Sequence, residues 1–268
     1  MFSNRQLNHQ HSDDASPCFS VICRCGRGSA ATYIKESAMK PTASNLIRWS
    51  GLSAMAAGII FIGIQPIHPP DVLSSVTTSA WAIVTSFKTA MALFGLLGLA
   101  GLYARQAEKA GWLGLAGYLL FSIFFALTTA FAFAEAFFLP LLATDAPKFV
   151  EGILGLASGS ASPISLGPVS TIYALLGAGY MLGSLLFGIA TFRARLLPRW
   201  AAVLLALSGP LAAVMGTLLP HPLDRMAAVP MGLALAWLGY GLLSERRAKA
   251  TEPALSMVNP RLSQTGAQ

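Results

Sequence analysis

Long apolar segments are the feature that most restricts how this chain folds. Six of them, each close to 20 residues or longer, follow one another between residues 46 and 243. A helix rises about 1.5 Å per residue, so about 20 apolar residues cross the roughly 30 Å hydrocarbon core of a bilayer. The alternating pattern of a membrane β-barrel is absent from the sequence. The sequence therefore predicts an all-α, polytopic transmembrane helix bundle.

The expected spans have short connections, with one exception. They cover residues 46–66, 80–103, 112–140, 167–192, 200–220 and 226–243. The long connection, 141–166, contains DAPKFVEGILGLAS, which predicts a short helix at the membrane surface with Asp145 as its N-cap and Pro147 in its first turn.

Basic residues alternate between the connections and predict the orientation. They gather before the first span, in every second connection and after the last span, at Lys40, Arg48, Arg105, Lys109, Arg193, Arg195, Arg199, Arg246, Arg247 and Lys249. The other connections hold only Lys148 and Arg225. Basic loops stay in the cytoplasm, so we expect a plasma-membrane (inner-membrane) protein with both termini cytoplasmic. The same distribution explains the net charge of +7 without nucleic-acid binding.

Polar segments flank the predicted transmembrane domain of residues 45–244. We expect residues 1–44 and 245–268 to be disordered and cytoplasmic. The stretch MKPTASNLIRW resembles an ordinary start of a membrane protein, so Met39 is a candidate initiator. The three cysteines all precede it and lack the paired C-x2-C spacing typical of structural zinc.

Two segments share the same motif at each end. LIRWSGLSAMAAGIIFIGIQPIHPPD begins at Leu46 and LPRWAAVLLALSGPLAAVMGTLLPHPLD begins at Leu197; both open near Arg-Trp and close with His-Pro-x-Asp. Arginine and tryptophan anchor helices at the membrane interface, and proline ends a helix. The first and fifth spans point the same way, so the pattern predicts duplicated helical hairpins in parallel orientation.

The repeated corner places His68, Asp71, His221 and Asp224 on one side of the membrane. The simplest interpretation is a helix stop followed by a capping aspartate. A second is a shared metal site, since imidazole and carboxylate suit zinc and similar divalent metals. A third is pH sensing by histidine. The sequence leaves all three interpretations open.

Two ionisable residues lie inside predicted spans. Lys88 is in the second span and Glu135 is in the third. A lysine at the centre of a span costs about 2.5–3.5 kcal/mol, so each requires a reason. Both lie near the same end of neighbouring antiparallel spans, so an ion pair is allowed; independent snorkelling to the interface and a solute or proton site are the alternatives.

Other motifs indicate packing. Gly179 and Gly183 permit close helix approach, and Pro210 predicts a kink in the fifth span. The chain has no P-loop, dinucleotide fingerprint, G-x-S-x-G or H-E-x-x-H, so no catalytic residue and no cofactor is assigned.

One stretch resembles a family pattern. FGIATFRARLLPRWAAVLL, residues 187–205, is similar to bacterial multi-pass membrane proteins of unknown function, and QPIHPPD and AFAFAEAFFLP are similar to the same group. The resemblance implies a six-span bacterial inner-membrane protein and no activity.

The working hypothesis is binding or transport of a small solute or ion at a polar site in the outer half of the bundle. This site would be built from Lys88, Glu135, His68 and His221. The alternatives are an enzyme whose metal is held by His68, Asp71, His221 and Asp224, and a non-catalytic scaffold or sensor subunit. The expected partners are the lipid bilayer, a small solute and further copies of the chain.

Overall fold

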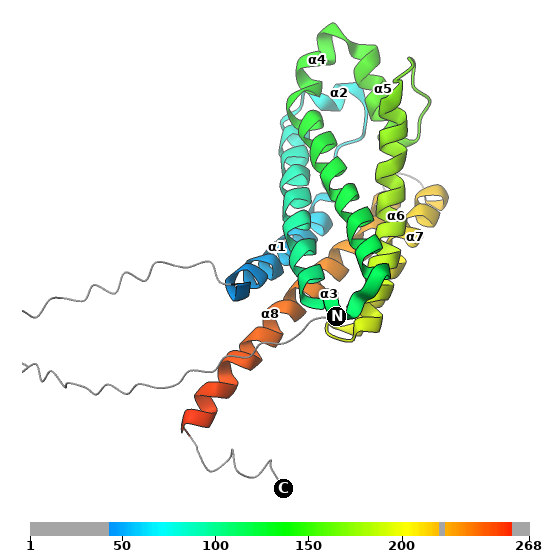
Figure 1. Cartoon of the computed structure of the whole chain (residues 1–268). Coiled ribbons are helices and arrows are strands. Elements are labelled where there is room, and N and C mark those ends of the chain that lie inside the picture. Colours follow the sequence, from blue (N-terminus) through cyan, green and yellow to red (C-terminus); the bar gives the residue numbers. More distant parts are fainter. Residues whose placement is uncertain (1–42, 220–222, 259–268) are drawn as a thin grey trace, which may run out of the picture. The chain divides into compact units, whose positions relative to one another are not determined.

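The chain folds into a bundle of helices (Figure 1). The computed structural model describes residues 43–219 and 223–258, and within these ranges there is no strand. The helices are α1 (Ala43–Ile64), α2 (Leu73–Val76), α3 (Ser79–Phe137), α4 (Leu139–Asp145), α5 (Pro147–Ser158), α6 (Pro168–Ala194), α7 (Arg199–Leu218), η1 (Leu223–Ala228) and α8 (Val229–Val258). Five stretches of the described chain are helical, long and apolar enough to cross a membrane. The predicted class, a multi-pass helical membrane protein, is confirmed.

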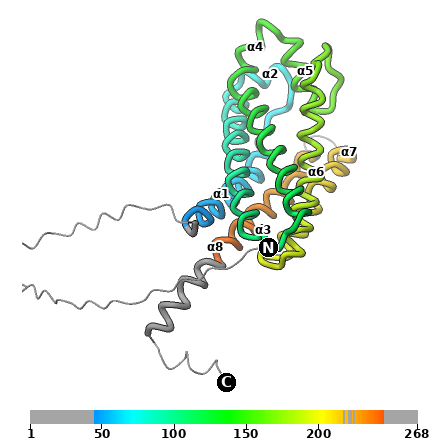
Figure 2. The backbone as a smooth tube through the Cα atoms, viewed as in Figure 1, coloured from blue at the N-terminus to red at the C-terminus, as the bar shows by residue number. Residues whose placement is uncertain are grey.

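The helix α3 is too long to be a single straight span. Its 59 residues would extend about 88 Å as a continuous helix, almost three hydrocarbon thicknesses. Gly111 interrupts it with φ 58° and ψ −162°, a conformation that a residue without a Cβ adopts readily. Its two ends meet, because the indole Nε1 of Trp81 donates a hydrogen bond of 2.9 Å to the carbonyl oxygen of Glu135. The two halves therefore run antiparallel and side by side (Figures 1 and 2).

Glycines allow the long helices to pack closely. A Cβ on Gly98 of α3 would lie 2.7 Å from the backbone nitrogen of Ala54 in α1. A Cβ on Gly183 of α6 would lie 2.6 Å from the backbone nitrogen of Phe121, and one on Gly179 would lie 2.9 Å from the carbonyl oxygen of Leu120. The packing role predicted for Gly179 and Gly183 is thus confirmed.

The connection between the halves of the bundle differs in detail from the prediction. Pro147 begins α5 as expected, but the N-cap is Ala146, with no side-chain hydrogen bond. Asp145 is instead the last residue of α4, so its predicted capping role is wrong. The stretch LPLLATD forms a helix of its own, which places Asp145 before the break at Ala146. The buried face of α5 packs in one apolar cluster with Trp81 and Leu139.

The helix α8 runs further than expected, whereas α7 keeps close to its predicted bounds. α7 continues as a helix through Pro210. α8 extends to Val258, beyond residue 244, where the disordered tail was predicted to begin. The sequence ERRAKA after Ser244 consists of good helix formers, which explains the extension. The predicted disorder of residues 1–42 and 259–268 falls outside the described residues.

Candidate functional site

A cavity of about 420 Å³ lies inside the bundle, at the end where α1 stops and α3 begins. Its wall combines charged, polar and aromatic side chains from α1, α3, α5, α6, α7, η1 and the segment after α1. The lining residues are Phe61, Ile64, Gln65, His68, Lys88, Met91, Phe124, Thr128, Phe131, Glu135, Ala157, Tyr173, Leu176, Gly177, Tyr180, Ala212, Arg225, Ala227 and Ala228. Three of the four predicted binding residues, Lys88, Glu135 and His68, are among them.

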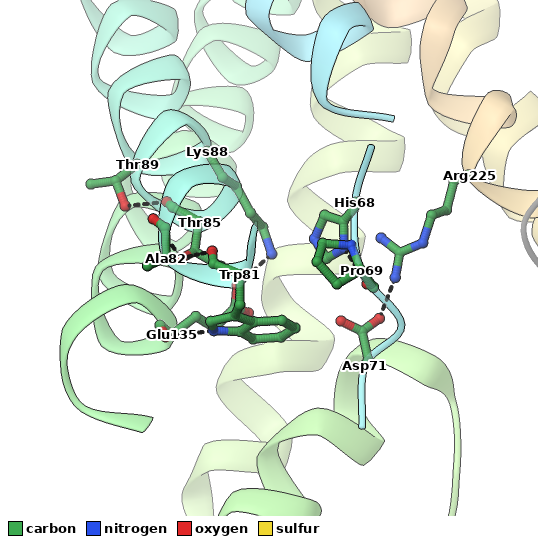
Figure 3. A network of polar contacts seen from close by, with 10 residues as sticks. All are labelled: His68, Pro69, Asp71, Trp81, Ala82, Thr85, Lys88, Thr89, Glu135 and Arg225. Atoms are coloured by element: carbon green, nitrogen blue, oxygen red, sulfur yellow. Dashed lines mark hydrogen bonds and ion pairs between the residues drawn. The ribbon is translucent and has the colours of Figure 1, made fainter. Parts of the chain in front are cut away.

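Lys88 and Glu135 form an ion pair across the two halves of α3. The ammonium Nζ of Lys88 donates to Oε2 of Glu135 at 2.7 Å (Figure 3). The side chain of Glu135 is 7% exposed and that of Lys88 is 25% exposed. The pairing that the sequence allowed is present, and it neutralises two charges in the apolar interior.

The start of α3 fixes the position of Lys88. The hydroxyl of Thr78 caps this helix by accepting a hydrogen bond from the backbone nitrogen of Trp81. Trp81, Thr85 and Lys88 follow at intervals of four and three residues, so they share one helix face. Trp81 and Thr85 are both fully buried. This face therefore turns Lys88 towards the second half of α3 and the cavity.

His68 lies in the segment between α1 and α2, beside Trp81. The Pro69-Pro70 sequence keeps this segment out of a helix. The His68 ring meets the Trp81 ring edge-on at a centroid distance of 5.9 Å, and its Nδ1 lies 2.7 Å from the carbonyl oxygen of Pro69. A carbonyl only accepts, so Nδ1 carries the proton and Nε2 is an acceptor.

The charge state of His68 follows from its surroundings. Burial, followed by the nearby cations Lys88 and Arg225, lowers the pKa of His68 from 6.5 to about 4. The Pro69 carbonyl and the Asp71 carboxylate oppose this change without reversing it. His68 is therefore a neutral member of the site at neutral pH.

Arg225 is a site residue that the sequence analysis did not single out. Its Nη2 donates to Oδ2 of Asp71 at 2.6 Å, and this ion pair joins η1 to the segment after α1 (Figure 3). One signal pointed to it, since Arg225 is one of only two basic residues in connections otherwise free of positive charge. A basic residue that does not contribute to the cytoplasmic excess of positive charge is expected to have a structural or binding role where it stands.

The proposed metal ligands are only partly placed. Asp71 contacts Arg225, and Nδ1 of His68 contacts the Pro69 carbonyl. His221 falls outside the described residues, and nothing of the Asp224 side chain is described. Within the described part of the chain, no group of three histidine, cysteine, aspartate or glutamate residues is arranged to hold a metal ion. The four-residue metal site stays a prediction.

Two tyrosines of α6 complete the wall. Tyr173 packs edge-on against Phe131 at 5.3 Å, and Tyr180 packs against Phe124 at 4.9 Å between ring centroids. The hydroxyl of Tyr180 and the Nε of Arg225 are buried without a hydrogen-bond partner among the described residues. The cavity thus has aromatic walls, a charged end and buried polar groups that nothing in the described chain satisfies.

Comparisons with known proteins do not extend this description. No family model, no curated protein and no solved structure matches the chain. The functional argument therefore depends on the chemistry of the cavity.

Proposed function

We propose that this chain is a six-span bacterial inner-membrane protein that binds or transports a small solute. The two halves of α3 count as two spans, which raises the five apolar stretches to six. The duplicated hairpins inferred from the two Arg-Trp segments fit this count. Both termini are then cytoplasmic, and the cavity opens towards the periplasm.

Exposed tryptophans support this topology. Trp49, Trp112 and Trp200 are 64%, 86% and 74% exposed, although tryptophan is usually largely buried. Each lies at or near the start of a predicted odd-numbered span, close to basic residues. Indole rings concentrate at the membrane–water interface, so these three fit a belt at the cytoplasmic surface.

The observation that carries the binding role is the cavity around an intramembrane ion pair. Packed protein interiors contain few voids larger than a water molecule, and an ion pair that only holds two helices together needs none. The volume of about 420 Å³ lies within the range of about 300–1,000 Å³ typical of small-molecule pockets. A largely apolar wall with a few polar groups is also typical of such pockets.

Filling the cavity tests this proposal. Gly177 lines the cavity, and a Cβ built there meets no atom within 4 Å, so Gly177→Phe places a ring in open space. Gly63→Phe is the matched control, because Gly63 also has nothing within 4 Å but lies outside the lining. Both changes remove a helix glycine and should preserve the fold.

The readout is thermal unfolding of the protein in phosphatidylcholine nanodiscs. Benzoate, benzylamine, benzyl alcohol and phenylalanine serve as probes of different charge on a similar ring. At least one should raise the melting temperature saturably in the natural protein and in Gly63→Phe, but not in Gly177→Phe. Binding that survives in Gly177→Phe, or no binding by any probe, would contradict the proposal.

A scaffold role is the second candidate. It is favoured by the pairing of both cations in the site, Lys88 with Glu135 and Arg225 with Asp71. A scaffold predicts that no probe binds and that Gly177→Phe has no effect on cells that need the protein. The same experiment therefore separates the two.

A further inference from the structure

We propose that the solute is a small organic anion, a monocarboxylate with an apolar body, whose carboxylate lies between Lys88 and Arg225. This inference rests on the proposed binding function and assigns its chemical class. It goes beyond the ion pair, because it gives Arg225 a role in recognition.

The charges around the cavity form two ion pairs. Two permanent cations, Lys88 and Arg225, line the cavity, but only one carboxylate, Glu135, does so. Asp71 pairs with Arg225 from outside the lining. Asp71 lies 2.6 Å from Arg225, so the four charges sum to zero, and the preference for an anion rests on the hydrogen-bond donors of the wall and not on a net charge.

The geometry places the two cations on either side of His68. Figure 3 shows the Lys88 ammonium and the Arg225 guanidinium extending towards the imidazole from different elements. Both are close enough to His68 to depress its pKa. A carboxylate bound between the two cations would therefore lie near both positive charges, and the neutral imidazole would add no third charge.

Arg225 has N–H groups that donate no hydrogen bond to the described residues. A guanidinium carries five N–H donors in a planar fork that fits a carboxylate. The described structure uses Nη2 for Asp71 and leaves the buried Nε without an acceptor. The hydroxyl of Tyr180, on the same cavity, is also unpartnered among the described groups. Ligand oxygens are the atoms that would satisfy such groups after a small adjustment of the wall.

The apolar part of the cavity wall indicates that the remainder of the ligand, beyond its carboxylate, is apolar. The cavity is lined by Phe61, Met91, Phe124, Phe131 and Leu176, most of it from α3 and α6. An inorganic anion such as phosphate would leave this surface uncovered and would require more donors than the site offers. An aromatic or aliphatic body buries the same surface favourably.

The test compares three ligands that share one ring and differ in charge. Benzoate, benzylamine and benzyl alcohol are titrated calorimetrically into the full chain in phosphatidylcholine nanodiscs. We expect benzoate to bind at least about tenfold more tightly than either analogue, which corresponds to one charge-assisted hydrogen bond. Its binding should disappear in Gly177→Phe.

Variants then locate the carboxylate. The double variant Asp71→Asn, Arg225→Gln removes an ion pair without leaving a lone charge, and it should weaken benzoate at least about tenfold. Arg225→Lys keeps the charge but loses the fork, so it should have an intermediate effect and serves if the double variant does not fold. Lys148→Gln, at an exposed position outside the lining, should leave binding unchanged.

Each of the other outcomes would overturn a specific part of the proposal. If benzylamine or benzyl alcohol binds better and Gly177→Phe blocks it, the anion class is wrong while the binding function stands. If benzoate binds, and neither the double variant nor Arg225→Lys changes its affinity, the placement of the carboxylate is wrong. If nothing binds, the proposed function fails together with its ligand class.

Discussion

Removing Lys88 alone should strongly destabilise the bundle. In Lys88→Met, the Glu135 carboxylate keeps its buried position with a side chain only 7% exposed. The lost attraction over 2.7 Å is about 6 kcal/mol before desolvation is counted, for an effective dielectric constant of about 20. Because Lys88 would no longer need to be desolvated, the expected net cost is smaller, about 3–5 kcal/mol, the usual penalty for leaving one partner of a buried pair alone.

A second substitution should restore most of this loss. In Lys88→Met combined with Glu135→Leu, apolar side chains replace both charges, and such replacements of buried pairs are often neutral or stabilising. We expect the free energy of unfolding to return to within about 1 kcal/mol of the natural protein, so that the coupling between the two sites is at least about 2 kcal/mol. Reversible unfolding in dodecyl maltoside and dodecyl sulfate mixed micelles measures all four corners of this cycle. Lys148→Met, at an exposed position, is the control and should change little.

Two results would refute this reasoning. A loss below about 1 kcal/mol in Lys88→Met would mean that both charges reach water independently. A double variant as unstable as the single one would mean that the pair is not the cause. The reversed pair, Lys88→Glu with Glu135→Lys, separates structure from recognition: we expect it to fold and to lose benzoate binding. If it folds and still binds as the natural protein does, a specific anion site at Lys88 is untenable.

Three further predictions concern single positions. Thr191→Val removes the hydroxyl that accepts a 2.8 Å hydrogen bond from Nε2 of the buried Gln106, so it should lower the free energy of unfolding by about 1–3 kcal/mol in the same assay. Gly183→Leu would force α6 away from the backbone of Phe121, and size-exclusion chromatography should show aggregation, whereas Gly216→Leu, at a position with nothing within 4 Å of a Cβ, should elute normally. Because the folded pKa of His68, about 4, lies below its ordinary value of 6.5, the unfolded chain binds the proton first. Stability is therefore full above pH 6.5 and falls as the pH drops towards 4, by at most about 3 kcal/mol, and His68→Gln should flatten this part of the pH profile measured by thermal unfolding.

Helix content and span positions follow directly from the sequence. An apolar stretch must be as long as the bilayer is thick, and this length alone predicted bounds that lie within a few residues of the long apolar helices in most cases. The contact between Lys88 and Glu135 could also be predicted from the sequence. Neighbouring antiparallel spans bring residues at the same depth in the membrane side by side. Both inferences use one dimension, the depth along the membrane normal.

Whether the remaining residues belong to the site depends on how each helix is rotated about its own axis. The depth of a residue in the membrane does not determine this rotation. Tyr173 and Tyr180 look the same in the sequence as aromatic residues that face lipid. Close packing at Gly179 and Gly183 is what brings α6 against the second half of α3. The tyrosines then meet Phe131 and Phe124 instead of lipid. A lipid-facing and a cavity-facing aromatic side chain are equally apolar, so composition does not separate them.

The Asp71–Arg225 ion pair connects the two His-Pro-x-Asp corners in an unexpected way. Asp71 ends the first corner, and Arg225 directly follows Asp224, which ends the second. The structure joins Asp71 and Arg225 at 2.6 Å, so the first corner lies against η1 at the residue that follows Asp224. This contact is an ion pair, and it leaves Nε of Arg225, a residue of the cavity lining, without an acceptor among the described groups. Only one of the two corners has an arginine after its aspartate, since Val72 follows Asp71. If the hairpins are duplicates, recognition by Arg225 therefore depends on a position at which the two copies differ.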